Sequence, residues 1–103
     1  MDRVAVITGA SRGIGAATAL ALAQNGFRVV VNYRSSAEEA DAVVRAAAAA
    51  GGQAVAIRAD VTAPDDVAAL FEQTEQRWGR VDVLVHNALI PYDVTSFADL
   101  SWE

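Results

Sequence analysis

The sequence predicts an α/β protein built on a doubly wound parallel sheet. Short apolar, β-branched runs alternate three times with longer segments that have helical periodicity. The runs are nearly continuous rather than alternating in polarity, which is typical of strands buried on both faces of a parallel sheet. A glycine-rich loop joins the first run to the first helical segment, where such sheets carry a ligand site. A chain of 103 residues allows one domain.

Four strands are expected, each centred on one of the β-branched runs. The runs occupy residues 4–7, 29–31, 55–57 and 81–85, and Asp82 interrupts the last of them. Right-handed crossovers between parallel strands favour the order 3-2-1-4 across the sheet. The switch point then lies between the first and fourth strands, and a ligand is expected there.

The first two helices are expected between these strands, each ending at a glycine. Residues 14–25 are rich in Ala and Leu, and Gly26 follows them. Residues 37–50 are predicted to form the second helix, because Ser36 and Glu39 stand at capping-box spacing at its start and Gly51 follows its end.

The third helix follows the third strand. Thr62 or its neighbour caps it, Pro64 is tolerated in its first turn, and Gly79 ends it. A fourth helix is expected to start at Asp99 or Ser101. The core face of the third helix, at steps of three and four residues, is predicted to be Val67, Leu70, Phe71, Thr74 and Trp78.

Composition excludes several classes of protein. Apolar residues make up 53% and charged residues 20%, unlike a disordered tail. No apolar run approaches the ~20 residues that span a bilayer. The net charge of −5 argues against a nucleic-acid binder. The chain has no cysteine, which excludes disulfides and thiolate metal sites and favours a reducing cytoplasm.

Three glycines mark the loop between the first strand and the first helix. Gly9 allows a tight turn, Gly13 lets a pyrophosphate approach bare backbone, and Gly15 lets the helix pack close to the sheet. The amides of the helix N-terminus would face the phosphates. The spacing is G-x-x-x-G-x-G rather than G-x-G-x-x-G, and the lysine of a P-loop is missing. The alternative is an ordinary turn that starts a helix.

The octet TGASRGIG at residues 8–15 resembles the cofactor loop of the short-chain dehydrogenase/reductase family. Further segments match the family in order and spacing, at residues 32–34, 60–61 and 85–88. Within the family the sequence is most similar to the 3-oxoacyl-[acyl-carrier-protein] reductase group. The resemblance implies a Rossmann-like fold and hydride transfer between a nicotinamide and a carbonyl or alcohol carbon. It covers the whole chain but less than half of a typical member, so residues 1–103 are expected to form a partial dinucleotide-binding domain.

The segment after the second strand favours NADP(H) over NAD(H). An NAD site needs a carboxylate there to accept from the ribose 2′-OH, and residues 32–34 include no acid. Arg34 and Arg12 instead provide two guanidinium groups that suit a 2′-phosphate. The alternative for Arg34 is a solvated surface arginine.

The resemblance gives roles to residues after the third and fourth strands. It places Asp60 at the adenine amino group, whereas the residues alone equally allow a turn or cap carboxylate before Thr62. His86 and Leu89 depart from the family's Asn-Asn-Ala-Gly, and a lone His at a strand end is more often structural than catalytic. The expected cofactor-binding residues are Gly9, Ser11, Arg12, Gly13, Ile14, Gly15, Arg34, Asp60, Val61, Asn87 and Ala88.

No catalytic residue is expected in the chain. The family's chemistry uses a tyrosine phenol with a lysine four residues later, and all eight basic residues here are Arg. Tyr33 is followed at that spacing by Ala37, and Tyr92 by Ser96. Three readings stay open: the cofactor-binding part of a reductase, a nucleotide-binding module without turnover, and an interaction fragment that binds no cofactor.

The fourth strand also predicts self-association. Its sequence is apolar and β-branched, with one charge, and no later strand follows to pair with its free side. Such an edge presents unpaired backbone groups to any similar strand. The 103-residue chain is therefore expected to be marginally stable and to self-associate through this edge or to aggregate.

Overall fold

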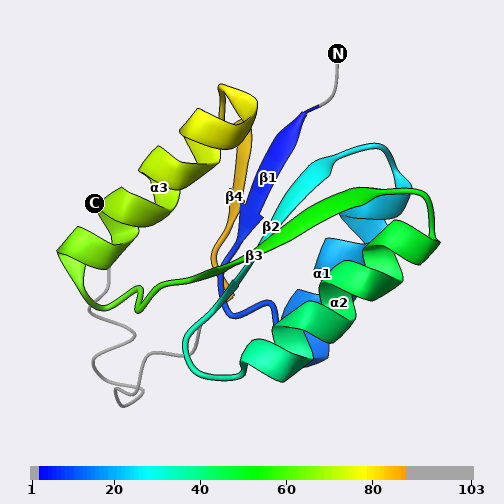
Figure 1. Cartoon of the computed structure of the whole chain (residues 1–103), viewed down its shortest axis with the longest axis horizontal. Helices are drawn as coiled ribbons and strands as arrows, with labels where there is room; N and C mark the ends of the chain where they lie inside the picture. The colour runs from blue at the N-terminus through cyan, green and yellow to red at the C-terminus, as the bar shows by residue number, and fades with distance from the viewer. Residues whose placement is uncertain (1–2, 88–103) are drawn as a thin grey trace, which may run out of the picture.

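The computed structural model describes residues 3–87 and contains one parallel sheet of four strands (Figure 1). The strand order is β3-β2-β1-β4, which confirms the predicted topology. The second and third strands are longer than predicted, because they pair along their full length from Arg28 opposite Gln53 to Tyr33 opposite Arg58. The strands are β1 (Val4–Ile7), β2 (Arg28–Tyr33), β3 (Gln53–Arg58) and β4 (Val83–Val85).

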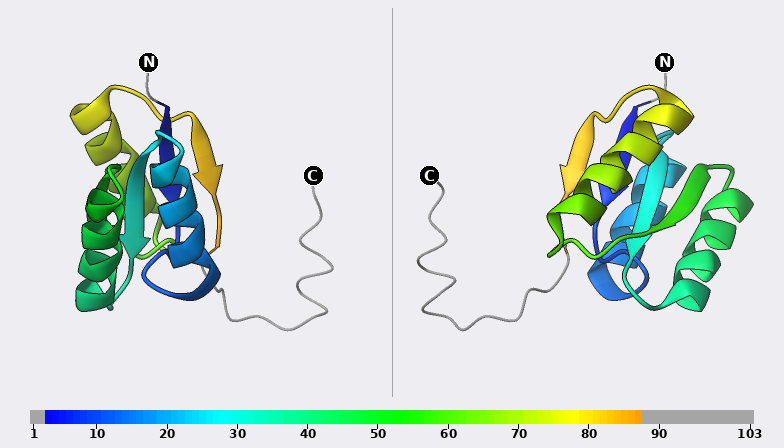
Figure 2. Two further views of the ribbon diagram at one scale, coloured as in Figure 1. Left: turned by 90° about the vertical axis from the view of Figure 1, so that its right-hand side faces the viewer. Right: turned by 60° about the vertical axis from the view of Figure 1, so that its left-hand side comes forward.

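Three helices cover the sheet in two layers (Figure 2). Helices α1 (Gly13–Gln24) and α2 (Ala37–Ala49) lie on one face, and α3 (Pro64–Trp78) lies on the other. None of the helices in residues 3–87 is long and apolar enough to cross a membrane. The predicted start of a fourth helix lies outside the described residues.

Alternate residues of the central strands supply the two cores. Ile7 and Val31 pack toward α1 and α2, whereas Val6 and Val30 pack toward Leu70 of α3. All four residues of β1 are buried, as expected for an inner strand of a parallel sheet. Most of the predicted core face of α3 is confirmed, with Leu70 and Thr74 buried and Phe71 and Trp78 partly buried and packed against the core; Val67 is partly buried.

The predicted capping box of α2 is wrong, whereas the predicted cap of α3 falls on the neighbour of Thr62. Ser36 stands at the N-cap of α2 but makes no side-chain cap bond, so the capping box with Glu39 is not formed. Its φ and ψ of −97° and 65° lie outside the extended conformation that usually aims an N-cap hydroxyl at the first-turn amides. Ala63, rather than Thr62, is the N-cap of α3, and the Thr62 hydroxyl bonds to Asp60 instead.

Strand β4 begins two residues later than predicted. Next to it, the side chain of Asp82, rather than a backbone carbonyl, accepts the hydrogen bond of the Val4 amide. The Asp82 Oδ2 accepts a hydrogen bond from the Val4 amide at 2.8 Å, and Arg80 Nε donates to Oδ1 at 2.9 Å. These bonds, with that of Arg80 first, lower the pKa of the Asp82 carboxyl. The charge therefore points toward β1, away from the side of β4 with which no strand in residues 3–87 pairs.

Self-association through β4 stays a prediction, and Leu84 is the residue that tests it. Among the described strands β4 pairs only with β1, and Leu84 is 51% exposed. Leu84→Lys is expected to raise the concentration at which the chain associates by roughly tenfold, because burying a Leu is worth about 1.5–3 kcal/mol. Light scattering over a concentration series measures this. Ala42→Lys, an exposed position on α2, adds the same charge as a control. A monomer at every concentration, unchanged by Leu84→Lys, would contradict the prediction.

Candidate functional site

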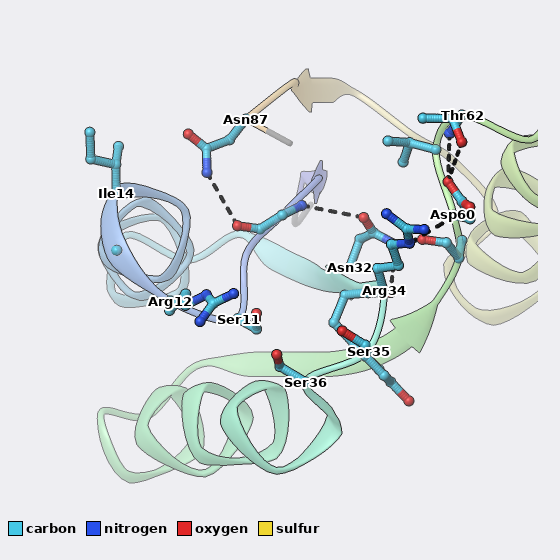
Figure 3. A pocket seen from close by; sticks show the side chains of 15 residues that line it. Ser11, Arg12, Ile14, Asn32, Arg34, Ser35, Ser36, Asp60, Thr62 and Asn87 are labelled. Atoms are coloured by element: carbon cyan, nitrogen blue, oxygen red, sulfur yellow. Dashed lines mark hydrogen bonds and ion pairs between the residues drawn. The ribbon is translucent and has the colours of Figure 1, made fainter. Parts of the chain in front are cut away.

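A cleft of about 570 Å³ lies over the carboxyl ends of the strands (Figure 3). Segments that follow β1, β2, β3 and β4 all contribute to its wall, as the doubly wound topology predicts. Its lining residues are Gly9, Ser11, Arg12, Gly13, Ile14, Asn32, Tyr33, Arg34, Ser35, Ser36, Ala59, Asp60, Val61, Thr62 and Asn87.

The glycine loop needs its glycines for two different reasons. Gly9 and Gly13 have φ of 60° and 62°, a left-handed conformation that disfavours residues with a Cβ. Gly15 is required by contact: an added Cβ would meet the Gly9 carbonyl oxygen and would lie 2.6 Å from Asn87 Nδ2. The absence of a side chain at Gly15 therefore lets α1 pack closely against the glycine loop and against Asn87, which follows β4.

The N-terminus of α1 opens into the cleft with the features of an anion site. Its N-cap, Arg12, makes no side-chain cap bond, and no acidic residue occupies the first turn. A Cβ added to Gly13 would meet nothing within 4 Å, so there is open space next to this backbone. The first amides of a helix lack intrahelical acceptors and carry partial positive charge. This end of α1 is therefore suited to phosphate.

Two asparagines hold Gly9 from opposite sides (Figure 3). The Gly9 amide donates to Asn32 Oδ1 at 3.3 Å, and Asn87 Nδ2 donates to the Gly9 carbonyl at 3.2 Å. Asn32 is 2% exposed, and its Nδ2 also donates to the carbonyls of Ile57 and Ala59 at 3.2 Å each. Asn32 thereby fixes the loop to β3. Sequence reasoning missed this role, although a polar residue directly after a buried apolar run is a signal for it.

His86 has a structural contact at the end of β4. Its Nδ1 lies 3.3 Å from Thr8 Oγ1, and the same hydroxyl accepts from the Asn87 amide at 2.8 Å. The Thr8 amide donates to the Val85 carbonyl at 3.0 Å. These bonds tie the carboxyl ends of β1 and β4 together, as the structural interpretation of His86 predicts.

Arg34 and Asp60, predicted separately, come together on one side of the cleft (Figure 3). Arg34 Nε lies 3.7 Å from Asp60 Oδ2. Asp60 Oδ1 accepts from the Thr62 hydroxyl at 2.6 Å and from its amide at 2.9 Å. The two Thr62 bonds, and then the charges of Arg34 and Arg58, lower the Asp60 pKa. Asp60 is therefore a charged turn residue facing an arginine at neutral pH.

A second ion pair, between Arg58 and Asp66, stabilises this turn. Asp66 Oδ2 accepts from the Asp60 amide at 2.8 Å and from Arg58 Nη1 at 3.1 Å. Arg58 Nε donates to the Arg34 carbonyl at 3.2 Å. The ends of β2 and β3 and the start of α3 are thereby connected.

Most of the predicted cofactor residues line the cleft. Gly15 is buried and is not among the lining residues, and Ala88 lies outside the described residues. Within residues 3–87 no group of three or more His, Asp or Glu side chains could hold a metal ion. Sequence reasoning did not assign the lining residues Asn32, Tyr33, Ser35, Ser36, Ala59 and Thr62 to the site.

Comparison with known families agrees with this geometry. The family profile described as short chain dehydrogenase matches residues 3–103. The chain belongs to the short-chain dehydrogenase family. A 3-oxoacyl-[acyl-carrier-protein] reductase from Synechocystis is 54% identical over 91 residues, which are 88% of this chain and 37% of that protein. The chain spans about two fifths of the length of the curated relatives it matches.

Solved structures of short-chain dehydrogenases share the fold. A hydroxysteroid dehydrogenase from Escherichia coli is 39% identical with a TM-score of 0.81, over 85% of this chain and 37% of that one. A metagenomic short-chain oxidoreductase in complex with NADP is 46% identical, also with a TM-score of 0.81, over 85% of this chain and 39% of that one.

Proposed function

We propose that the chain is the cofactor-binding part of an NADPH-dependent short-chain reductase that acts on a carbonyl compound, with 3-oxoacyl thioesters as the favoured substrate class. The observation that carries this proposal is the cleft itself. It combines the open N-terminus of α1 with Arg12 and Arg34, and no acid occupies residues 32–34.

The residues around the cleft fit a phosphorylated dinucleotide. The amides at the start of α1 would hold the pyrophosphate, next to the open space at Gly13. Arg34 would face the 2′-phosphate as an exposed guanidinium, and Arg12 would add a second positive charge to the cleft. Bound NADPH supplies the hydride for carbonyl reduction. The NADP complex of the metagenomic relative supports the choice of cofactor.

A nucleotide-binding module without turnover is the second candidate. The chain contains no lysine, whereas residues 3–87 include the glycine loop and line a cleft. Finding the gene's reading frame to continue past Glu103 into a Tyr-x-x-x-Lys helix would favour the reductase; a stop codon there would favour the module.

Arg34→Asp is expected to weaken NADPH binding at least about tenfold more than NADH binding. A charged hydrogen bond to phosphate is worth about 1.5–3 kcal/mol, and a carboxylate there would repel the 2′-phosphate. Calorimetric titration with both cofactors measures the change. Arg45→Asp, an exposed position on α2 that does not line the cleft, makes the same charge change and should leave the ratio unaltered. Equal losses for both cofactors in Arg34→Asp would remove Arg34 from the phosphate site.

A further inference from the structure

Hydrogen bonds fix the side chain of Asp60, whereas the side chain of its partner Arg34 is largely exposed. Both Thr62 hydrogen bonds to Asp60 end on the same oxygen, Oδ1, at 2.6 and 2.9 Å. The other oxygen, Oδ2, faces Arg34 Nε at 3.7 Å, which is longer than a hydrogen bond. The side chain of Arg34 is 73% exposed, against 23% for that of Asp60. The pair is therefore a weak surface ion pair in which the arginine is free to turn toward another anion.

We propose that Asp60 determines cofactor specificity by competing with the 2′-phosphate of the ligand for the guanidinium of Arg34. This inference rests on the proposed function, in which the cleft binds NADP(H). When Arg34 turns to a phosphate, the Asp60 carboxylate loses the charge of Arg34 and keeps only that of Arg58, which is paired with Asp66. The Asp60 carboxylate stays fixed by Thr62 beside the incoming dianion. Asp60 therefore lowers the preference for a phosphorylated ribose below what Arg34 alone would give.

Asp60→Asn separates this role from a structural one. The amide oxygen of Asn can accept both Thr62 bonds in place of Oδ1, so the turn before α3 is retained. The group that faces Arg34 then becomes an uncharged NH₂. The substitution removes the competing charge and leaves the shape of the cleft in place. Ser35 and Ser36, the other polar residues that follow Arg34 in the lining, carry no charge.

The test is calorimetric titration of the chain and of Asp60→Asn with 2′,5′-ADP and 5′-AMP, which differ only in the 2′-phosphate. We expect the ratio of 2′,5′-ADP affinity to 5′-AMP affinity to rise about three- to tenfold in Asp60→Asn, because the charge that competes with the 2′-phosphate is removed, whereas any contact of residue 60 with the adenine would change both affinities alike. Asp41→Asn on α2, away from the cleft lining, makes the same charge change and should not alter the ratio.

Three outcomes would overturn the inference. An unchanged ratio in Asp60→Asn, while the parent chain prefers 2′,5′-ADP, would refute the competition and leave the proposed function standing. Equal weakening of both nucleotides would show that the carboxylate acts on the part they share. A parent chain that binds neither nucleotide, or binds both equally, would refute the proposed function and this inference together.

Discussion

Gly15→Ala is expected to abolish tight cofactor binding and to lower the free energy of unfolding by about 1–3 kcal/mol. The added methyl would meet the Gly9 carbonyl oxygen and would lie 2.6 Å from Asn87 Nδ2 and 3.0 Å from Ala10 Cα. The Gly9 and Ala10 backbone and the hydrogen-bonded Asn87 side chain cannot easily move away from the added methyl group. The start of α1 would shift, and with it the amides that we propose hold the pyrophosphate. Chemical denaturation and NADPH titration measure the two effects.

Gly13→Ala adds the same methyl two residues earlier and tests the phosphate space instead of the packing of α1. Here the new Cβ would meet nothing within 4 Å, and the φ of 62° costs an alanine about 1 kcal/mol. The methyl would occupy the space that we assign to the phosphates, so NADPH binding should fall at least tenfold, by the 1.4 kcal/mol that such a factor represents. NADPH affinity equal to that of the parent chain in Gly13→Ala would show that the phosphates do not lie at this backbone.

The 103-residue chain on its own is expected to give no reductase turnover. Hydride transfer to a carbonyl carbon must be matched by a proton delivered to the oxygen, and a phenol with a pKa of ~10 does this poorly without a neighbouring cation. The resemblance to the family assigns that task to a tyrosine with a lysine four residues later. The chain has no lysine, and Tyr33 is followed at that spacing by Ala37.

The measurement is NADPH oxidation in the presence of a 3-oxoacyl thioester, which should stay at the rate without protein. A reductase of full family length serves as the positive control. Robust turnover by the chain, lost when one of its own residues is replaced, would show that its residues include a proton donor that the sequence does not reveal.

Fold topology was predictable because it depends on patterns that are local in the sequence. The β-branched runs at residues 4–7 and 29–31 lie in the two central strands, and the intervening helices fix the parallel direction. Strand ends were less predictable. Arg28 and Gln53 extend β2 and β3 through backbone pairing, which does not require an apolar side chain. Asp82 shortens β4 because its carboxylate binds the Val4 amide.

Residues of the candidate site were predictable where residue type and spacing indicate a role. Contacts between residues far apart in the sequence were harder to predict. The glycine loop and Arg34 could be recognised from spacing and charge. The position of Asn32 directly after a buried apolar run signals a structural role, but its partners Ile57 and Ala59 lie 25 and 27 positions away, and no local pattern identifies them. The ion pair of Arg34 with Asp60 likewise depends on β2 and β3 being neighbours with aligned ends.

Calorimetric titration of the parent chain with NADPH and with NADH tests the proposed site most directly. The two cofactors differ only in the 2′-phosphate that we assign to Arg34 and Arg12. We predict saturable binding of both, with NADPH bound roughly tenfold or more tightly, as one charged hydrogen bond to phosphate would give. Equal affinities, or tighter binding of NADH, would contradict the assignment of the cleft to NADP(H).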